Sequence, residues 1–571
     1  MEDKSFTIDD LSIVICGEAG QGVETSAEMI ADVFKSCGYN TLVVKEYMSR
    51  IRGGSNSSEI RISNSKNLSF VERIDVLILL SKKCFDSISP RLSYKTIIIA
   101  NKETLPEKAA EKYKNIMYLS ELSADSKLYV NIEALGTVLS LVKEDFSSLE
   151  LQIRKMFASK DDITIQKNIE AAKKGFSSLP NNDFTLNLNI VKNEDIKNEI
   201  FLSGGDAVSL GCIAGGCNFI SAYPMSPGTG VLTFLANNQN NYRIIAEQVE
   251  DEISAINMAI GASYTGARAM VTTSGGGFAL MTEGVSLSGM IETPIVIHIG
   301  QRPGPATGLP TRTAQEDLNL ALYAGHGEFV RAIYTPGDLE ECFYLSAKAF
   351  NLADKFQIPV FILTDQLILD SYQHTQPFNL DLVNIENHII KTDENYKRYK
   401  LTDDGVSPRG IPGFGNGLVV VDSDEHGEDG HITEDLSIRV SMTDKRLKKL
   451  EQMRNESEPP LFYGSETYKI LVVSFGSNKK VINEAMDILK REDMAFLHIN
   501  QPCPLHLSVG EYLQKAEKVI VIENNATAQL SSLIQLETGF NIDHKLLKYN
   551  GMPFSLEGIM ENLGEVNHES E

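Results

Sequence analysis

The chain contains few cysteines, and none of the seven forms a Cys-x-x-Cys pair. The closest two, Cys212 and Cys217, fall in a glycine-rich stretch that is predicted to start a helix. An odd number of scattered cysteines is typical of free thiols in a reducing compartment. Iron–sulfur clusters are held by suitably spaced cysteine thiolates. The cysteines of this chain offer no such spacing.

Basic residues are also in deficit, since 53 lysines and arginines face 77 aspartates and glutamates, for a net charge of −24. Phosphate binding requires a basic footprint, so this balance argues against a general nucleic-acid binder. We interpret the excess of acidic residues as a feature that keeps the protein soluble. No apolar run approaches the ~20 residues of a membrane span. The acidic N-terminus lacks the apolar segment of a signal peptide, so we expect a cytoplasmic protein without a membrane partner.

With 571 residues, the chain is long enough for several domains. Apolar runs of strand length alternate with helical patterns, which predicts an α/β fold with several doubly wound parallel-sheet domains. Residues 148–197 are charged and poorly patterned, which is typical of a helical linker. The predicted parts are residues 1–190 with this linker, 200–375, a loop-rich segment at 376–465, and 466–571.

A glycine-rich turn follows the first predicted strand and precedes a helical pattern. Its sequence, Gly17-Glu-Ala-Gly-Gln-Gly22, leaves free backbone N–H groups at the helix start, where Gly20 and Gly22 could cradle an anion. The glycine order differs from the G-x-G-x-x-G of dinucleotide folds, and a tight turn without a ligand is the alternative. Further on, Arg50 and Arg52 could bind a phosphate or form surface ion pairs.

The most informative stretch lies between residues 223 and 312, where four clusters each follow an apolar run. Ligands of open parallel sheets bind at the carboxyl ends of the strands, so these clusters should meet at one site. They provide an acidic helix start, a glycine loop that lets backbone approach a ligand, and arginines able to hold a carboxylate. The clusters are Tyr223-Pro-Met-Ser-Pro-Gly-Thr229, Glu247-Gln-Val-Glu-Asp-Glu252, Thr272-Thr-Ser-Gly-Gly-Gly277 and Gln301-Arg-Pro-Gly-Pro-Ala-Thr-Gly-Leu-Pro-Thr-Arg312.

This succession resembles the alpha subunit of the 2-oxoacid:ferredoxin oxidoreductases. The N-terminal glycine turn and the arginine pair are similar to the gamma domain of that family, so nearly the whole chain follows the order of a gamma–alpha fusion. Ser423-Asp-Glu-His426 with Gly430-His-Ile-Thr433 resembles its interdomain segment, and Glu523-Asn-Asn525 resembles part of its C-terminal domain. Several independent motifs in the right order are more specific than any one of them.

The resemblance implies an enzyme that uses thiamine diphosphate to decarboxylate a 2-oxoacid, with 2-oxoglutarate favoured, forming an acyl-CoA while ferredoxin is reduced, or the reverse. The alternatives are a transketolase-like thiamine-dependent transferase component and a non-catalytic scaffold. The chain lacks the Gly-Asp-Gly…Asn pattern with which related enzymes hold Mg²⁺ and the diphosphate. The resemblance therefore implies a beta subunit that shares the cofactor and carries Mg²⁺ and a 4Fe–4S cluster.

Thiamine chemistry requires one carboxylic acid that hydrogen-bonds to N1′ of the aminopyrimidine. The resemblance assigns this role to Glu252, although the helix dipole alone would favour acids at a helix start. The acidic candidates are Glu247, Glu250, Asp251 and Glu252. Further cofactor contacts are implied for Tyr223, Pro224, Ser274, Gly275 and Gly276.

A 2-oxoacid carboxylate requires a cation, and arginine gives a bidentate fit. Arg302 is the first candidate and Arg312 the second, but either could form a salt bridge with Glu316 or Asp317. Ser226 stands where the family has a substrate-contacting threonine, which implies a retained hydroxyl contact. The residues implied to lie near the CoA entrance or to face the partner are Gly20, Gly22, Arg50 and Arg52.

The histidines add no catalytic candidate. His298 lies within an apolar run and is predicted to be a hydrogen-bonded core residue. His426 and His431 lie in an acidic loop, but their spacing does not predict a metal site, so we expect no metal on this chain.

Overall fold

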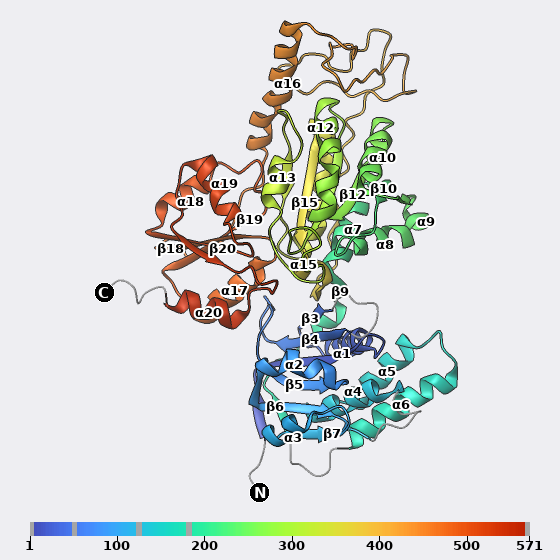
Figure 1. Cartoon of the computed structure of the whole chain (residues 1–571), viewed down its shortest axis with the longest axis vertical. Helices are drawn as coiled ribbons and strands as arrows, with labels where there is room; N and C mark the ends of the chain where they lie inside the picture. Colours follow the sequence, from blue (N-terminus) through green and yellow to red (C-terminus); the bar gives the residue numbers. More distant parts are fainter. Residues whose placement is uncertain (1–4, 48–53, 121–127, 179–184, 566–571) are drawn as a thin grey trace. The chain divides into compact units, whose positions relative to one another are not determined.

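The computed structural model describes residues 5–47, 54–120, 128–178 and 185–565 (Figure 1). Arg50 and Arg52 lie outside the described residues, so their predicted contacts stay predictions. Among the described helices, none has the length and apolar character needed to cross a membrane. The chain divides into two compact units. Unit 1 holds the chain before residue 203 and two distant segments, 371–377 and 555 onward, and unit 2 holds residues 203–370 and 378–554.

Unit 1 is built on a mixed sheet of eight strands. In spatial order these are β7 (Ile116–Tyr118), β6 (Leu92–Ala100), β5 (Ile74–Leu79), β2 (Asp10–Glu18), β4 (Ser55–Ser63), β3 (Thr41–Glu46), β16 (Tyr372–Thr375) and β9 (Ile200–Ser203). The sheet is parallel from β2 through β7, as expected from the sequence. From β2 through β4 and β3 to β16, neighbouring strands are antiparallel. A separate parallel pair joins β1 (Ser5–Ile8) to β8 (Thr185–Leu188).

Apolar residues cover both faces of this sheet, because successive side chains of a strand point to opposite sides. Ile13 and Ile15 of β2 join the larger core, whereas Val14 and Cys16 join the smaller one. The larger core includes residues of α1 (Val23–Ser36) and α4 (Val130–Leu141). The smaller core includes residues of α2 (Phe85–Ile88) and α3 (Glu107–Lys112).

The stretch predicted as a helical linker forms α5 (Phe146–Met156) and α6 (Asp162–Ser177), but both helices belong to the core of unit 1. Leu149 and Ile169, for example, are almost fully buried there. A methyl group at Gly136 of α4 would collide with the carbonyl oxygen of Ala172, so α4 and α6 pack backbone to backbone. The linker prediction was wrong because a narrow apolar stripe suffices to bury one face of an otherwise charged helix.

Unit 2 contains a six-stranded sheet in which every strand is parallel to its neighbours. In order, the strands are β11 (Ile245–Gln248), β10 (Phe219–Ala222), β12 (Ala269–Ser274), β13 (Ile295–Gln301), β15 (Pro359–Asp365) and β14 (Ala332–Tyr334). All residues of β12, β13 and β15 are buried, which explains their nearly continuous apolar sequences. The parallel α/β prediction is confirmed here. The larger helices are α7 (Gly204–Ala214), α8 (Thr229–Asn237), α10 (Glu252–Tyr264), α12 (Thr282–Met290) and α14 (Leu339–Phe356).

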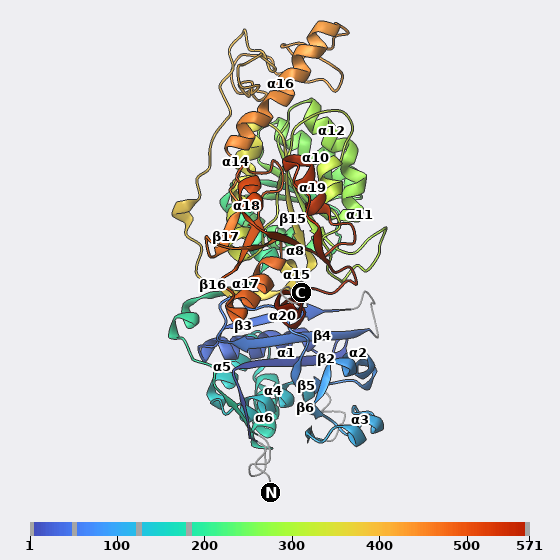
Figure 2. The ribbon, with the colours of Figure 1, turned by 90° about the vertical axis from the view of Figure 1, so that its left-hand side faces the viewer.

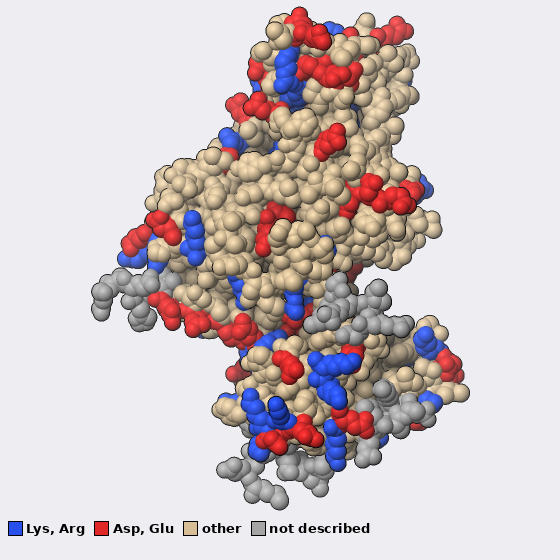
Figure 3. Space-filling view, viewed as in Figure 1, with Lys and Arg blue, Asp and Glu red and all other residues tan. Residues whose placement is uncertain are grey.

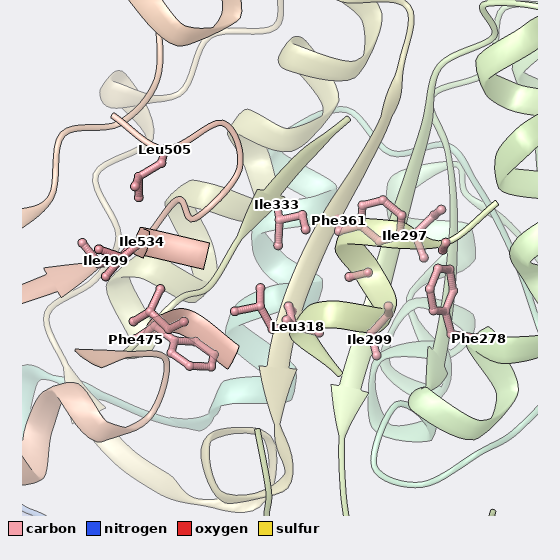
Figure 4. Close-up of a cluster of buried hydrophobic side chains, with 14 of the residues drawn as sticks. Phe278, Ile297, Ile299, Leu318, Ile333, Phe361, Phe475, Ile499, Leu505 and Ile534 are labelled. Carbon is pink, nitrogen blue, oxygen red and sulfur yellow. The ribbon is translucent and has the colours of Figure 1, made fainter. Parts of the chain in front are cut away.

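A second, five-stranded sheet completes unit 2. Its order is β17 (Leu461–Gly464), β19 (Met494–Ile499), β18 (Ile470–Phe475), β20 (Lys518–Glu523) and β21 (His544–Leu547), with only β17 antiparallel to its neighbour. The two sheets share one hydrophobic core, in which Ile297 and Phe361 of the first sheet join Phe475 and Ile499 of the second (Figure 4). This shared core explains why both sheets form a single compact unit.

Along the chain, a loop-rich segment at residues 378–435 separates the strands of the two sheets and leads into α16 (Leu436–Asn455). Figures 1 and 2 show the segment and α16 at one end of unit 2.

A buried ion cluster attaches α16 to the end of α12. The ammonium groups of Lys445 and Lys449 lie 2.7 and 2.5 Å from the carboxylate oxygens of Glu292. Arg398 of the loop donates to the carbonyl oxygen of the same glutamate over 2.6 Å.

Candidate cofactor and substrate site

The predicted site lies at a reversal of strand order in the six-stranded sheet. The chain passes from β10 to β11 on one side and then returns to β12, which pairs with the other side of β10. Open parallel sheets bind ligands at such a point, outside the carboxyl ends of the strands. Tyr223 and Pro224 directly follow β10, and Ser274 ends β12, so the structure places these three predicted residues at the reversal.

Two adjacent acids at the start of α10 have different environments. Asp251 caps the helix, because its side chain accepts a hydrogen bond from the Ser254 N–H over 2.7 Å. Glu252 is only 3% exposed, and its Oε1 has no hydrogen-bond partner among the described residues. The dipole and capping explanation therefore fits Asp251, whereas Glu252 is the acid oriented inward.

The glycine triplet packs between two carboxyl groups. It forms the short helix α11 (Gly275–Phe278). A methyl group at Gly275 would collide with the carboxylate of Asp317, and one at Gly277 would collide with Oε1 of Glu252. At Gly276 the only described neighbour within 4 Å would be the carbonyl oxygen of Ala306, at 3.4 Å. Glycine is thus needed at two positions for close approach of carboxylates, and the middle one leaves room beside it.

Among the residues that the structure describes, several buried oxygens around this turn have no hydrogen-bond partner. A buried polar atom without a partner costs about 1–3 kcal/mol, so such a concentration indicates a ligand that supplies donors. An aminopyrimidine ring offers an amino group and, at a protonated N1′, a further polar contact, so these residues fit the cofactor implied by the resemblance. The oxygens are Glu252 Oε1, Thr273 Oγ1, Ser274 Oγ and Asp317 Oδ2.

Two predicted substrate residues meet beside this turn. The Arg302 guanidinium, at the end of β13, donates from Nη1 to the carbonyl oxygen of Ser226 over 2.8 Å. Arg312 has a different neighbourhood, since its Nη1 lies 3.2 Å from the sulfur of Met552 and its stem lies against Gly551. The structure therefore joins Arg302 to the loop after β10 and Arg312 to the loop after β21.

Asp317 is a site residue that sequence reasoning treated only as an ion-pair partner of the arginines. Burial raises the pKa of its carboxyl group to about 7, with a further contribution from Glu316, while Arg302 acts in the opposite direction. The only sequence signal is its place shortly after the arginine-rich loop. Its contact with Gly275 depends on how that loop folds back, which no local pattern specifies.

The glycine turn of unit 1 borders a cavity of about 640 Å³. Gly20 and Gly22 both have positive φ angles, +90° and +72°, which explains why glycine occupies these positions. The turn connects β2 to the N-terminus of α1, where backbone N–H groups favour an anion. The cavity is also lined by Ser81, Lys82, Thr104 and Asn131.

The prediction for His298 agrees with the structure. His298 is fully buried, with Nδ1 2.8 Å from Thr272 Oγ1 and Nε2 2.9 Å from Thr364 Oγ1. Burial lowers its pKa to about 3, so it is a neutral core residue. His426 contacts the Asp424 carbonyl oxygen and the ring of Tyr399. Across the described part of the chain, no group of three or more potential ligands could hold a metal ion.

Comparisons with known proteins agree with this geometry. The family model for the thiamine diphosphate-binding part of pyruvate flavodoxin/ferredoxin oxidoreductases matches residues 210–445, and a pyruvate ferredoxin/flavodoxin oxidoreductase model matches residues 12–178. The chain is 32% identical to a 2-oxoacid:ferredoxin oxidoreductase subunit alpha from Sulfolobus, over 98% of each chain. It is 29% identical to the 2-oxoglutarate synthase subunit KorA of Methanothermobacter thermautotrophicus, over 65% of this chain and 99% of that one. The 2-oxoglutarate:ferredoxin oxidoreductase from Magnetococcus marinus, solved with 2-oxoglutarate, coenzyme A and succinyl-CoA bound, superposes with a TM-score of 0.90 at 29% identity, over 98% of this chain and 99% of that one.

Proposed function

Because this chain belongs to the alpha subunits of the 2-oxoacid:ferredoxin oxidoreductases, we propose that it provides the pyrimidine half of a thiamine diphosphate site and the clamp for a 2-oxoacid carboxylate. The reaction is oxidative decarboxylation of the 2-oxoacid to an acyl-CoA and CO₂ with reduction of ferredoxin, or its reverse. The substrate is proposed to be 2-oxoglutarate, which is supported by the names of two relatives.

The observation that carries this proposal is the buried Glu252 carboxylate, whose unpartnered Oε1 lies against Gly277 at the strand-order reversal. When bound, thiamine diphosphate supplies the electron sink for decarboxylation. Glu252 is proposed to hold a proton at N1′ of the aminopyrimidine. Ser274, Gly275 and Gly276 are proposed to let the ring approach the backbone, with Tyr223 and Pro224 at the end of β10 as further contacts.

The substrate carboxylate is proposed to bind Arg302, because arginine offers a planar pair of donors for a carboxylate. Ser226 is proposed to add a hydroxyl contact, and Arg302 already contacts the backbone of this residue. Arg312 is the second candidate. Its contact with Met552 directs it toward the C-terminal sheet, which makes it less suited to the same carboxylate.

Coenzyme A is proposed to enter near the glycine turn of unit 1, where Gly20 and Gly22 border the 640 Å³ cavity. The helix N-terminus there is suited to a phosphate group. Arg50 and Arg52 are proposed to assist in binding coenzyme A.

The partner is proposed to be a beta subunit that provides the diphosphate site, Mg²⁺ and a 4Fe–4S cluster, with ferredoxin as the electron acceptor. This chain has no cysteine spacing suited to a cluster.

The outer face of α10 is uncharged and exposes apolar side chains. Ile253 and Met258 of this helix are 49% and 44% exposed, and Leu280 nearby is 52% exposed. Figure 3 shows few charged residues over α10 and α12. Because α10 begins at the buried Glu252, a partner seated on this face is proposed to close the cofactor site as well. We propose that the complex is cytoplasmic.

Four domains are proposed: a gamma domain at 1–190, a pyrimidine-binding domain at 200–375, an interdomain segment at 376–465, and a transketolase C-terminal-like domain at 466–571. The family-model match at 12–178 lies within the first of these, and the match at 210–445 covers most of the second and third.

Co-expression tests the proposal. The isolated chain should bind thiamine diphosphate weakly and show no turnover, whereas the complex with a beta subunit should reduce a viologen with 2-oxoglutarate and CoA. A panel of other 2-oxoacids tests the substrate assignment. Turnover of 2-oxoacid with ferredoxin by this chain alone would contradict the shared site.

A further inference from the structure

We propose that Thr272 is a positioning residue for substrate binding, because its hydroxyl group, directed by the ring of His298, holds the loop at residues 226–228. This loop and Arg302 carry the proposed contacts to the substrate carboxylate, so the inference rests on the proposed function. It assigns a role to two buried polar side chains that the proposed chemistry leaves unused.

Three buried side chains on neighbouring strands form one hydrogen-bonded chain through an imidazole ring. Thr272 of β12, His298 of β13 and Thr364 of β15 are each at most 1% exposed. Nδ1 of His298 lies 2.8 Å from Thr272 Oγ1, and Nε2 lies 2.9 Å from Thr364 Oγ1. Beyond the ring, Thr272 Oγ1 lies 3.2 Å from the carbonyl oxygen of Gly228. At the other end, Thr364 Oγ1 lies 3.3 Å from the carbonyl oxygen of Ile299.

The hydrogen atoms of this chain have two consistent arrangements, because each hydroxyl group and the neutral ring carry one hydrogen. Burial lowers the pKa of His298 to about 3, so the ring is neutral at working pH. In the first arrangement, Nδ1–H donates to Thr272 Oγ1, and the Thr272 hydroxyl therefore donates to Gly228. In the second, the Thr272 hydroxyl donates to the ring, Nε2–H donates to Thr364, and the Thr364 hydroxyl donates to Ile299. Only the first holds the loop, and it is the arrangement of the working enzyme.

The loop rests directly on the ends of two strands, β12 and β13. A methyl group at Gly228 would lie 2.8 Å from the carbonyl oxygen of Thr273 and 3.0 Å from Thr272 Oγ1. A methyl group at Gly300 would lie 2.8 Å from Cγ of Pro227. Glycine at both positions therefore lets the loop touch the strands, and the Thr272 hydroxyl reaches it with a hydrogen bond from the sheet.

The proposed substrate contacts lie within two residues of Gly228. The carbonyl oxygen of Ser226 accepts a hydrogen bond from Nη1 of Arg302 over 2.8 Å, and Arg302 directly follows β13. Gly228 also precedes α8, and its carbonyl oxygen accepts from the Val231 N–H over 3.2 Å. Without the Thr272 hydroxyl, we expect the loop to shift relative to the sheet, which displaces Ser226 from the substrate carboxylate.

The test is a matched pair of substitutions in the complex with the beta subunit. Thr272→Val and Thr364→Val each remove one hydroxyl group from the same ring, at nearly the same distance. Thr272→Val should raise the KM for 2-oxoglutarate about two- to tenfold, the range for one lost neutral hydrogen bond, and leave the KM for CoA unchanged. Thr364→Val should leave both KM values near wild type, with a similar loss of thermal stability. Thr272→Ser retains the hydroxyl group and should restore the wild-type KM.

Hydrogen exchange of the full chain alone tests the position of the loop without activity. Thr272→Val should speed amide exchange at residues 226–231, and Thr364→Val should leave it unchanged. If Thr272→Val does not fold, Thr272→Cys is the second variant, and the same results are expected because a thiol is a weak donor.

Equal rises of KM in the two valine variants overturn the inference, because a purely structural chain would be damaged alike from either end. Equal exchange at residues 226–231 overturns it as well, as does a Thr272→Ser variant as impaired as Thr272→Val. If Arg302→Lys and Thr272→Val both retain the wild-type KM, the proposed clamp fails together with this inference. If Arg302→Lys loses affinity while Thr272→Val matches wild type, only this inference fails.

Discussion

The Nη1 group of Arg302 donates a hydrogen bond of 2.8 Å to the carbonyl oxygen of Ser226. This contact connects the loop after β13 with the loop after β10, two segments whose side chains were predicted separately to contact the substrate. The backbone of Ser226, and not its hydroxyl group, thus holds Arg302. The position of the arginine therefore depends on the path of the loop after β10.

Arg302→Lys should impair substrate handling more than cofactor binding. A lysine cannot reproduce the bidentate geometry, and a lost hydrogen bond to a charged group costs about 1.5–3 kcal/mol. We expect kcat/KM for the 2-oxoacid to fall roughly ten- to a hundredfold or more in steady-state assays. Arg312→Lys is the matched control and should stay near wild type. The reverse pattern would make Arg312 the clamp.

Glu252→Gln should abolish rapid deuterium exchange at C2 of the bound cofactor without destabilising the fold. The substitution replaces a buried carboxyl group, whose Oε1 has no hydrogen-bond partner among the described residues, by an amide of the same shape, so thermal stability should stay equal or rise. Asp251→Ala should behave oppositely, because losing the cap costs about 1 kcal/mol and leaves the exchange rate unchanged. Normal exchange in the Glu252 variant would transfer the role to another of the four acids.

Gly276→Ala should weaken thiamine diphosphate binding while the fold is maintained. Within the described part of the chain, the added methyl group meets only the Ala306 carbonyl oxygen, at 3.4 Å, and it is expected to point into the space proposed for the ring. We expect the Kd of the cofactor to rise about tenfold, equivalent to about 1.4 kcal/mol, by calorimetry of the complex. Gly510→Ala, where a methyl group would meet no described atom within 4 Å, should leave Kd unchanged. Equal Kd values in both variants would place the ring away from Gly276.

Glu292→Gln should destabilise unit 2. Burial by itself would raise the pKa of Glu292, but Lys449 and Lys445 outweigh it and hold that pKa well below its usual value. Removing one member of a buried ion cluster costs about 3–5 kcal/mol, because the lysines remain buried. A carboxyl group whose pKa is lowered by folding stabilises the fold at pH values above its pKa in the unfolded chain, about 4.3. This contribution is lost as the pH falls.

Thermal unfolding of wild type and the Glu292 variant should therefore differ most near pH 7 and converge in acid. Glu434→Gln, an exposed change on the loop-rich segment that leads into α16, should alter stability by less than about 0.5 kcal/mol. A Glu292 variant as stable as this control at pH 7 would show that the ion cluster contributes nothing net.

Prediction from sequence succeeded where the signal was local. The apolar runs of β12 and β13 predicted buried parallel strands, and the apolar surroundings of His298 predicted a core residue. It failed where burial depended on distant elements. The charged helices α5 and α6 were predicted as a linker, yet their few apolar residues pack into the core of unit 1.

The sequence by itself determined the α/β class, the order of the motifs, the family, and the acidic helix start that contains Glu252, because periodicity and motif spacing are properties of neighbouring residues. Only the tertiary structure decided which acid faces inward, which arginine joins Ser226, and that Asp317 lies against Gly275. It also placed β16 beside β3, more than three hundred residues earlier in the chain. Such contacts join segments far apart in sequence, and their partners are set by packing and register, which leave no local pattern to read.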